Sequence, residues 1–314
     1  MSEWVTAFAP ASIGNVGVGF DTLGLALEGA GDRVLARRTD GTRVSVAEVR
    51  GLDGELHPYL STDPESNTAS IAAQAFWDDH GDSGSVELKV HKGVPLQSGM
   101  GSSAASAVAA VVAANGLLDS PVAQEALLPY ALAGERFASG GLHADNVAPS
   151  LLGGLVLCPQ VLLPKVIHLP APNGVSAALI HPDLQVNTAQ ARRGLAKSYA
   201  TKLWVEQQGL LAGFISACHS SDLELIGRTL RDVIIEPQRK DAVPCFDVVK
   251  AAAERGGALG CSLSGSGPSI FALCRTGDAR NIASAMEQAC RSQGIGCQSW
   301  VSPMNAPGAR IENA

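Results

Sequence analysis

The sequence predicts an α+β protein of two lobes, each built from a sheet covered by helices. The chain has 314 residues, which is long enough for two domains with sizeable cores. Segments of alternating apolar and polar residues, typical of strands, are interleaved with longer helical segments along the chain. Prolines gather at Pro164, Pro170 and Pro172, between two such groups. We therefore expect one domain over residues 1–160 and a second over residues 161–314.

The first lobe is expected to mix strands and helices. Strands with period two are expected at residues 4–9 and 33–49, the latter interrupted by a turn at Asp40 and Gly41 that predicts a hairpin. The further elements expected in this lobe are a helix at 68–79, a strand at 85–91, an Ala-rich helix that starts near 104, a helix at 121–138 and a strand at 155–158. Between the last two, the segment SGGLHADNVAPSLLGG is expected to be a loop.

The second lobe alternates helices and strands, which predicts a two-layer sandwich. Its expected strands lie at residues 175–181, 258–262, 269–274 and 298–302. Its expected helices lie at residues 201–218, 222–233, 246–255 and 278–293.

Composition limits the classes of function. Hydrophobic residues make up 46% of the chain and charged residues 17%, as in ordinary globular enzymes. The net charge is −7 and Lys and Arg form no run, which argues against a nucleic-acid partner. The longest small-apolar stretch, residues 104–114, is too short to span a bilayer, and the N-terminal MSEWVTAF is unlike a signal peptide. We therefore expect no membrane association and a cytoplasmic location.

The seven cysteines form no C-x-x-C pair and lie mostly in apolar runs. They are expected to be reduced core residues, and no zinc site is predicted.

The segment GVPLQSGMGSS, residues 93–103, leads directly into the Ala-rich helix. Free N–H groups at a helix N-terminus attract anions, and Gly99 and Gly101 let the backbone approach phosphate oxygens. A Walker A loop is excluded because no Lys follows Gly101. The segment therefore indicates a phosphate-binding loop of another type, the alternative being a Gly-rich turn before an ordinary buried helix.

Two polar clusters accompany this loop in the first lobe. Asn15 and Asp21 lie among glycines in APASIGNVGVGFD, where they could bind an ammonium or hydroxyl group or act only as turn residues. Glu135 offers a hard oxygen to Mg²⁺, the alternative being a solvated ion pair on a helix surface. The residues His143 and Asp145 could be catalytic, or a structural histidine and a loop cap.

Two further clusters lie in the second lobe. Thr188 and Arg192, with Arg239 later in the chain, indicate a carboxylate clamp, because the guanidinium fork matches two oxygens. Surface ion pairs are the alternative. A second glycine-rich segment at residues 262–268, SLSGSGP, either presses backbone against a ligand or forms a tight hairpin.

In this order along one chain, the segments resemble the three-motif signature of the GHMP small-molecule kinases. The resemblance rests on APASIGNVGVGFDTLG, VPLQSGMGSSAASAVAA, GLHADNVAPSLLGG, VNTAQAR, IIEPQR, SLSGSGPSIFALC and NAPGARIEN, so it spans essentially the whole chain. VNTAQAR and DNVAP point to the branch whose acceptor is L-homoserine. The resemblance implies a first lobe similar to ribosomal protein S5 domain 2 and a ferredoxin-like second lobe.

The resemblance also implies roles for individual residues. The loop around the ATP phosphates would comprise Gly93, Val94, Pro95, Leu96, Gln97, Ser98, Gly99, Met100, Gly101, Ser102 and Ser103. Ser103 and Glu135 would hold Mg²⁺, and Asn67 would line the adenine pocket. The homoserine site would comprise Asn15, Asp21, His143, Asn146, Thr188, Arg192, Arg239, Gly265 and Gly267. The chemistry agrees, because a zwitterion needs Asp21 for its ammonium and the arginines for its carboxylate.

The implied reaction is ATP plus L-homoserine giving ADP and O-phospho-L-homoserine, a step towards threonine, carried out by a homodimer. APAS at residues 9–12 lacks the lysine that several sister kinases have there, so Asp145 is assigned a supporting role beside Asn146, with the phosphate as final proton acceptor. Met100 and Gly14 also depart from the superfamily, which usually has Leu and often Ala there.

Three other functions remain as alternatives. A mevalonate or sugar kinase would have no need for both arginines with Asp21. A non-catalytic sensor would be expected to have a damaged loop, yet GMGSSAAS is intact. A dinucleotide-dependent oxidoreductase is disfavoured because no strand with G-x-G-x-x-G opens the chain.

Overall fold

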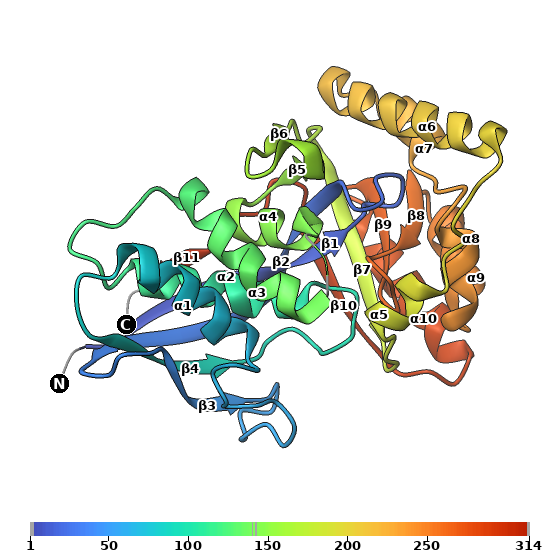
Figure 1. Ribbon diagram of the computed structural model, residues 1–314. Helices are drawn as coiled ribbons and strands as arrows, with labels where there is room; N and C mark the ends of the chain where they lie inside the picture. Colours follow the sequence, from blue (N-terminus) through green and yellow to red (C-terminus); the bar gives the residue numbers. More distant parts are fainter. Residues whose placement is uncertain (1–2, 140, 142, 313–314) are drawn as a thin grey trace.

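The computed structural model describes residues 3–139, 141 and 143–312. It forms two lobes, each an α+β assembly around its own sheet, so the predicted fold class is confirmed (Figure 1). The sheet of the first lobe has seven strands in the order β11-β1-β2-β4-β3, with β5 paired to β2 and β6. These strands are β1 (Val5–Gly14), β2 (Leu23–Thr39), β3 (Ser45–Arg50), β4 (Ser85–His91), β5 (Leu155–Leu157), β6 (Ile167–Leu169) and β11 (Arg310–Glu312).

The first lobe's helices surround one buried helix. They are α1 (Thr68–His80), α2 (Ser102–Asn115), α3 (Leu128–Ser139) and α4 (Ala144–Leu152), with short 3₁₀ turns at Gln124–Leu127 and Gln160–Leu162. Nearly every residue of α2 is buried, and alanines let α1, α3 and the sheet approach its axis closely. A helix that is apolar on all sides is a core helix. Because α2 is packed on all sides, its N-terminus is held in a fixed position.

The second lobe has a four-stranded sheet in the order β10-β7-β9-β8, all antiparallel. This strand order, with the last two helices of the lobe packed on one face, is that of the expected ferredoxin-like sandwich. Its strands are β7 (Val175–Pro182), β8 (Gly260–Leu263), β9 (Ile270–Arg275) and β10 (Cys297–Pro303). Its helices are α5 (Thr188–Arg193), α6 (Thr201–Ser220), α7 (Leu223–Thr229), α8 (Glu236–Arg239), α9 (Phe246–Arg255) and α10 (Ala279–Ser292), with a 3₁₀ turn at Lys240–Ala242.

The hairpin expected around Asp40 and Gly41 is wrong. Strand β3 does not pair with β2; it pairs in parallel with β4, which lies between them and is antiparallel to β2. The connection from β3 through α1 to β4 is thus a crossover of the kind that parallel strands require. The turn at Gly41 directs the chain away from β2.

The loop expected at residues 139–154 is also wrong, because α4 occupies most of it. Pro149 lies inside this helix, and seven of its nine residues are buried. Tertiary packing therefore outweighs the local preference of proline for helix ends. The helix expected at 121–138 starts later, at Leu128.

The first sheet includes two strands from the second half of the chain, and the lobes share a core. Strands β6 and β11 come after residue 160 yet complete the first sheet, so the division at residue 160 stays a proposal. A buried cluster joins Ile13 and Leu25 of the first lobe to Phe214, Leu179 and Phe271 of the second. All seven cysteines are buried and free, as expected. Within the described residues, no helix has the length and apolar character to cross a membrane.

Candidate active site

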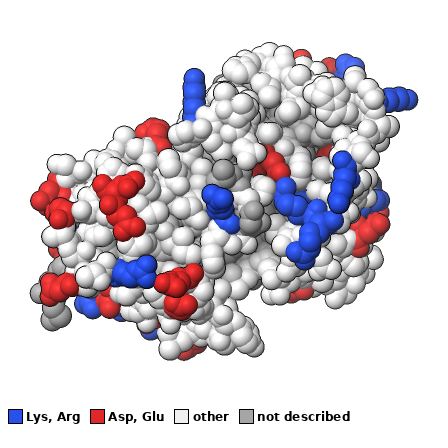
Figure 2. All heavy atoms as spheres, viewed as in Figure 1, with Lys and Arg blue, Asp and Glu red and all other residues white. Residues whose placement is uncertain are grey.

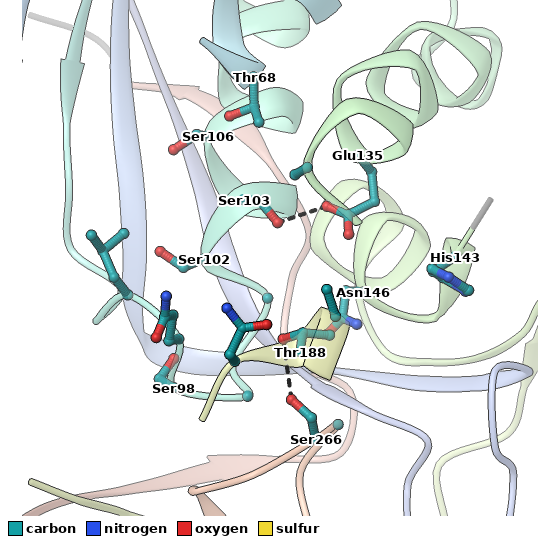
Figure 3. A pocket seen from close by; sticks show the side chains of 18 of the residues that line it. Thr68, Ser98, Ser102, Ser103, Ser106, Glu135, His143, Asn146, Thr188 and Ser266 are labelled. Carbon is teal, nitrogen blue, oxygen red and sulfur yellow. Dashed lines mark hydrogen bonds between the residues drawn. The ribbon is translucent and has the colours of Figure 1, made fainter. Parts of the chain in front are cut away.

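A cavity of about 440 Å³ lies between the lobes (Figure 3). The structure brings most of the predicted site residues to its wall. Those that line it are Asn15, Asp21, Asn67, Leu96, Gln97, Ser98, Gly99, Gly101, Ser102, Ser103, Glu135, His143, Asp145, Asn146, Thr188, Arg192, Arg239 and Gly265. Those that do not are Gly93, Val94, Pro95, Met100 and Gly267. Gly140 and Leu142 of the predicted motif lie outside the described residues.

The predicted phosphate loop ends at the N-terminus of α2. Gly99 and Gly101 have φ of 76° and 69°, values that favour glycine, and Gly101 is the N-cap of the helix. A Cβ on Gly101 would overlap the Ser12 hydroxyl, so the loop packs tightly against β1. Among the described residues, seven N–H groups of the segment 93–103 have no hydrogen-bond partner: those of Leu96, Gln97, Ser98, Gly99, Gly101, Ser102 and Ser103. The loop therefore offers the donors that an anion needs.

The ion pair of Lys92 and Asp32, which the sequence analysis did not predict, is buried beside the start of the loop and of α2. The Lys92 ammonium contacts the Asp32 carboxylate and donates to the Ser102 carbonyl and the Ser106 hydroxyl, both at 2.8 Å. Oδ1 of Asp32 accepts from the N–H groups of Gly93 and Val94, at 2.8 and 3.0 Å. Gly93 and Val94 therefore do not line the cavity; they fix the start of the loop through their hydrogen bonds to Asp32.

Met100 and Asn67 also have structural partners. The Met100 side chain is fully buried in the core between the lobes, so it contributes packing rather than a surface for phosphate. Asn67 caps α1 by accepting from the N–H of Ala69 at 2.9 Å, and it donates to the Ser61 carbonyl at 2.8 Å. Asn67 therefore shapes the cavity wall while its own amide is engaged.

Glu135 lies at the end of the cavity beside α2. It is buried, so the alternative of a solvated surface pair is wrong. Its Oε2 accepts from the Ser103 hydroxyl at 2.7 Å, across the gap between α3 and α2 (Figure 3). Within the described residues no group of three or more acidic, His or Cys side chains is suited to a metal. A hard cation here would thus need further oxygens from phosphate and water, as Mg²⁺ does beside nucleotides.

Two arginines line the cavity, and they differ in their partners. Arg192 of α5 forms a bidentate pair with Asp21, with distances of 2.8 and 2.7 Å. Asp21 raises the pKa of Arg192 through these bonds. Arg239 of α8 is 5% exposed and donates to the Gly265 carbonyl at 3.0 Å. Both guanidinium groups lie near the Phe20 ring, with their Cζ atoms 5.3 and 5.2 Å from its centroid.

This pairing changes one expectation. The sequence predicts that Asp21 takes an ammonium and Arg192 a carboxylate, but in this structure they bind each other. Burial lowers the pKa of Arg239, the nearby charge of Arg192 adds to that effect, and Nε of Arg239 has no partner among the described residues. A buried cation with an unused donor is a site for an anionic group. On the face drawn in Figure 2, Lys and Arg side chains gather around α5.

Asp145 lies in the first turn of α4, not in a loop as expected. Burial raises its pKa to about 7, and the charges of Asp21 and Glu135 add to that rise. Its Oδ2 accepts from the N–H of Asn15 at 3.2 Å, whereas Oδ1 has no partner among the described residues. A Cβ on Gly14 would lie 2.9 Å from that Oδ2, so the departure from Ala at this position leaves room for the carboxylate.

Three further predicted residues lie around these charges. Asn146 accepts from the Ser12 hydroxyl at 2.9 Å. His143 lies 3.7 Å from Asp21, and burial lowers its pKa. Thr188 lies 3.2 Å from the hydroxyl of Ser266, beside Gly265 (Figure 3).

A two-lobed α+β fold with a glycine-bearing anion loop at the start of a buried helix defines a class of small-molecule kinases. Residues 67–154 match the family model "GHMP kinases N terminal domain", and residues 214–292 match "GHMP kinases C terminal". The chain is 44% identical to a homoserine kinase of Xylella fastidiosa over 97% of its length and 93% of that protein. It is 42% identical to one from Chlorobium phaeobacteroides, with 98% and 99% covered.

The same likeness holds in three dimensions. The crystal structure of homoserine kinase from Cytophaga hutchinsonii matches with a TM-score of 0.94 and 42% identity, over 99% of this chain and 98% of that one. The chain belongs to the homoserine kinase family of the GHMP kinases. As a GHMP kinase, it uses ATP.

Proposed function

We propose that the protein transfers the γ-phosphoryl group of ATP to the hydroxyl of L-homoserine, giving O-phospho-L-homoserine for threonine biosynthesis. The observation that carries the proposal is the single cavity wall that combines an anion loop with charged groups of both signs. Asp21, Arg192 and Arg239 match the ammonium and carboxylate of an amino acid. A sugar or mevalonate has no ammonium for Asp21 to bind.

The phosphate loop would bind the nucleotide through its unpaired N–H groups. Ser98, Gly99 and Gly101 present theirs along the loop, and Ser102 and Ser103 present theirs at the positive end of α2. Leu96 and the walls of β3 and β4, with Val49 and Val90, give the base an apolar surface. Phosphoryl transfer depends mainly on positioning and charge neutralisation, which this preformed loop supplies.

Ser103 and Glu135 would hold Mg²⁺. Both offer hard oxygens, and Glu135 brings a negative charge to a buried position beside the loop. Bound there, the ion would neutralise phosphate charge. The protein's part is to fix the two side chains, which α2 and α3 hold in contact across their interface.

A homoserine zwitterion would replace the contact between Asp21 and Arg192. Asp21 would bind the substrate ammonium in place of Arg192, and Arg192 would bind the substrate carboxylate in place of Asp21. Neither residue would then be left without a partner. Arg239 would also donate to the substrate carboxylate, through its unused Nε. Asn15, His143, Asn146 and Thr188 complete the acceptor wall.

Asp145 and Asn146 are assigned supporting roles beside the reacting hydroxyl. Because the pKa of Asp145 is about 7, much of its population is protonated at neutral pH, and its charge opposes the phosphates less than an ordinary carboxylate would. The phosphate is then the final acceptor of the hydroxyl proton.

The test is ADP release with a panel of acceptors. With ATP and Mg²⁺, we expect rapid release with L-homoserine and only background release with mevalonate, galactose or water. Removal of Mg²⁺ by a chelator should abolish the reaction. Equal release with mevalonate or galactose would contradict the assignment of the acceptor, and rapid turnover without a divalent cation would contradict the metal assignment.

The homodimer and the cytoplasmic location implied by the resemblance also stay proposals. Light scattering of the purified protein checks the first, because a dimer would have twice the chain's mass of 32.3 kDa.

A further inference from the structure

The phosphate loop is held by donors on its carbonyl side. Four consecutive carbonyl groups, those of residues 97–100, each accept a hydrogen bond from elsewhere in the chain. The N–H of Val186 binds Gln97 at 3.2 Å, and the N–H of Ser269 binds Ser98 at 3.1 Å. The hydroxyl of Ser264 binds Gly99 at 2.6 Å. The N–H of Ser12 binds Met100 at 3.0 Å.

These bonds set the direction of the N–H groups on the other side of the loop. In a planar trans peptide, the carbonyl of one residue and the N–H of the next point in opposite directions. Fixing the carbonyls of residues 97, 98 and 100 therefore fixes the N–H groups of Ser98, Gly99 and Gly101, which are three of the unpaired donors. Fixing the Gly99 carbonyl fixes the next N–H, that of Met100, which donates to the Ser98 hydroxyl at 3.2 Å.

Ser264 differs from the other three donors because it acts through its side chain. Its own backbone is held in the tight turn 264–269, by bonds from its N–H to Ser269 and from Gly267 to its carbonyl, at 2.9 and 2.8 Å. The residue is fully buried. A Cβ on Gly99 would overlap the Ser264 carbonyl and lie 2.7 Å from that of Gly267, so the two glycine-rich loops are in direct backbone contact.

We propose that the Ser264 hydroxyl is a positioning group that orients the phosphate loop for nucleotide binding. This rests on the proposed function, since it takes the loop to be the ATP site. Loss of the hydroxyl would leave the partly buried Gly99 carbonyl without its hydrogen-bond donor. The peptide between Gly99 and Met100 would then turn to find another partner and disturb the neighbouring donors. Substrate binding at Arg239 uses other contacts of this turn, through Gly265.

The test compares Ser264→Ala with a matched control in the full-length protein. Ser302→Ala removes another fully buried serine hydroxyl that joins the lobes, since Oγ of Ser302 accepts from the N–H of Glu28 at 2.9 Å, away from the loop. ADP affinity is measured by calorimetry, KM for ATP and for homoserine by steady-state kinetics, and stability by thermal melting. Ser264→Cys keeps the size of the side chain with a weaker donor.

We expect Ser264→Ala to weaken ADP binding and raise the KM for ATP about tenfold, with the KM for homoserine within about twofold. Ser264→Cys should lie between Ala and the wild type, and it decides the matter if the Ala variant does not fold. Ser302→Ala should lower the melting temperature but leave ADP affinity unchanged.

ADP affinity within twofold of the wild type in Ser264→Ala would overturn the proposal. So would an equal loss in Ser302→Ala, or an equal rise in KM for both substrates, because either would indicate general loosening of the lobes. Failure of the wild type to bind ADP would overturn the nucleotide site itself and this inference with it.

Discussion

The binding capacity of each charged residue in the cavity depends on the partners that it already has in the folded protein. Arg239 has one backbone acceptor and an unused Nε, whereas Arg192 is paired through two hydrogen bonds with Asp21. Both guanidinium groups pack against the Phe20 ring, at 5.3 and 5.2 Å from its centroid. The two arginines thus place two cations on the cavity wall, one with an unused donor and one already paired.

Arg239→Leu is expected to reduce homoserine use by about 2–5 kcal/mol in kcat/KM, the cost of leaving one partner of a buried charge pair unmet. The KM for ATP should barely change. The matched control is Arg193→Leu, because Arg193 is exposed on the same short helix as Arg192. Steady-state kinetics with homoserine and with 3-aminopropan-1-ol, which lacks the carboxylate, form a complete cycle. Equal losses for the two acceptors would mean that Arg239 supports the fold instead of the substrate.

Asp145 gives the stability of the protein a pH dependence of known sign. Its pKa is about 7 in the folded protein, against an ordinary value of 3.8 for an aspartate in water, so the folded chain binds the proton more tightly than the unfolded chain does. Asp145 therefore contributes to the free energy of unfolding in full below pH 4. That stabilisation is lost as the pH rises to about 7, at about 1.4 kcal/mol per pH unit. Above pH 7 it changes no further.

Asp145→Asn should therefore remove about 4 kcal/mol of pH dependence between pH 4 and pH 7. Urea unfolding at several pH values measures this difference. The exposed Asp241→Asn is the control and should follow the wild type. Parallel curves for wild type and Asp145→Asn would show that Asp145 is ionised in the folded protein as in the unfolded chain. The same variant tests proton transfer, because a general base would cost about 10²–10⁴-fold in rate.

Residues in recognisable segments were predicted from the sequence, whereas those in ordinary strands were not. Asp21, Asn146 and Ser103 lie in glycine-rich or capping segments that have few structural uses. Asp32 and Lys92 lie in β2 and directly after β4, in sequences that any strand could have. Their contact joins positions 60 residues apart, and neither local sequence contains a sign of it.

At the scale of elements, the site depends on how β2 and β4 hold the start of α2. Asp32 accepts four hydrogen bonds: from Lys92, from the Ser106 hydroxyl at 2.6 Å, and from the N–H groups of Gly93 and Val94. One carboxylate therefore connects both strands, the loop entry and the first turns of α2.

Helices α1 and α9 and strand β4 were predicted nearly to the residue, because their periodic patterns and flanking residues agree with their burial.

Two elements could not be predicted locally. The pairing of β3 with β4 depends on the crossover through α1, which brings together strands that are distant in sequence. Helix α4 contains a proline and is stabilised by burial against β1 and β2, so only the tertiary structure reveals it. Both errors concern long-range contacts, which periodicity does not encode.

The Lys92–Asp32 pair should separate stability from nucleotide binding. Lys92→Met leaves a buried carboxylate without its cation and should cost about 3–5 kcal/mol of unfolding free energy. The double variant Lys92→Met, Asp32→Leu should recover much of that stability, because no charge is left buried. It should not recover the KM for ATP, because the N–H groups of Gly93 and Val94 have then lost their acceptor.

Chemical denaturation and ATP kinetics on both variants measure the two effects. Recovery of both stability and the KM for ATP in the double variant would show that the pair has no role beyond stability.

At the scale of the whole molecule, the cavity exists only while both lobes are in place. The phosphate loop belongs to the first lobe, but two of the four bonds to its carbonyls come from Ser264 and Ser269, and a third comes from Val186. The cluster around Phe214 and Phe271 buries apolar side chains of both lobes in one core. The lobes are thus divided in sequence but not in packing.

We therefore expect the chain to unfold in one cooperative transition and the fragment 1–160 not to fold alone. That fragment would lack β6 and β11, so β1 and β5 would each lose a strand partner, and residues such as Ile13 and Leu25 would lose their cover. Calorimetry of the full chain and circular dichroism of the fragment are the measurements. ADP and homoserine together should raise the melting temperature of the full chain more than either alone, because their proposed sites occupy different parts of one cavity. Two resolved transitions, or a fragment 1–160 that melts cooperatively, would instead establish residue 160 as the boundary of an independent domain.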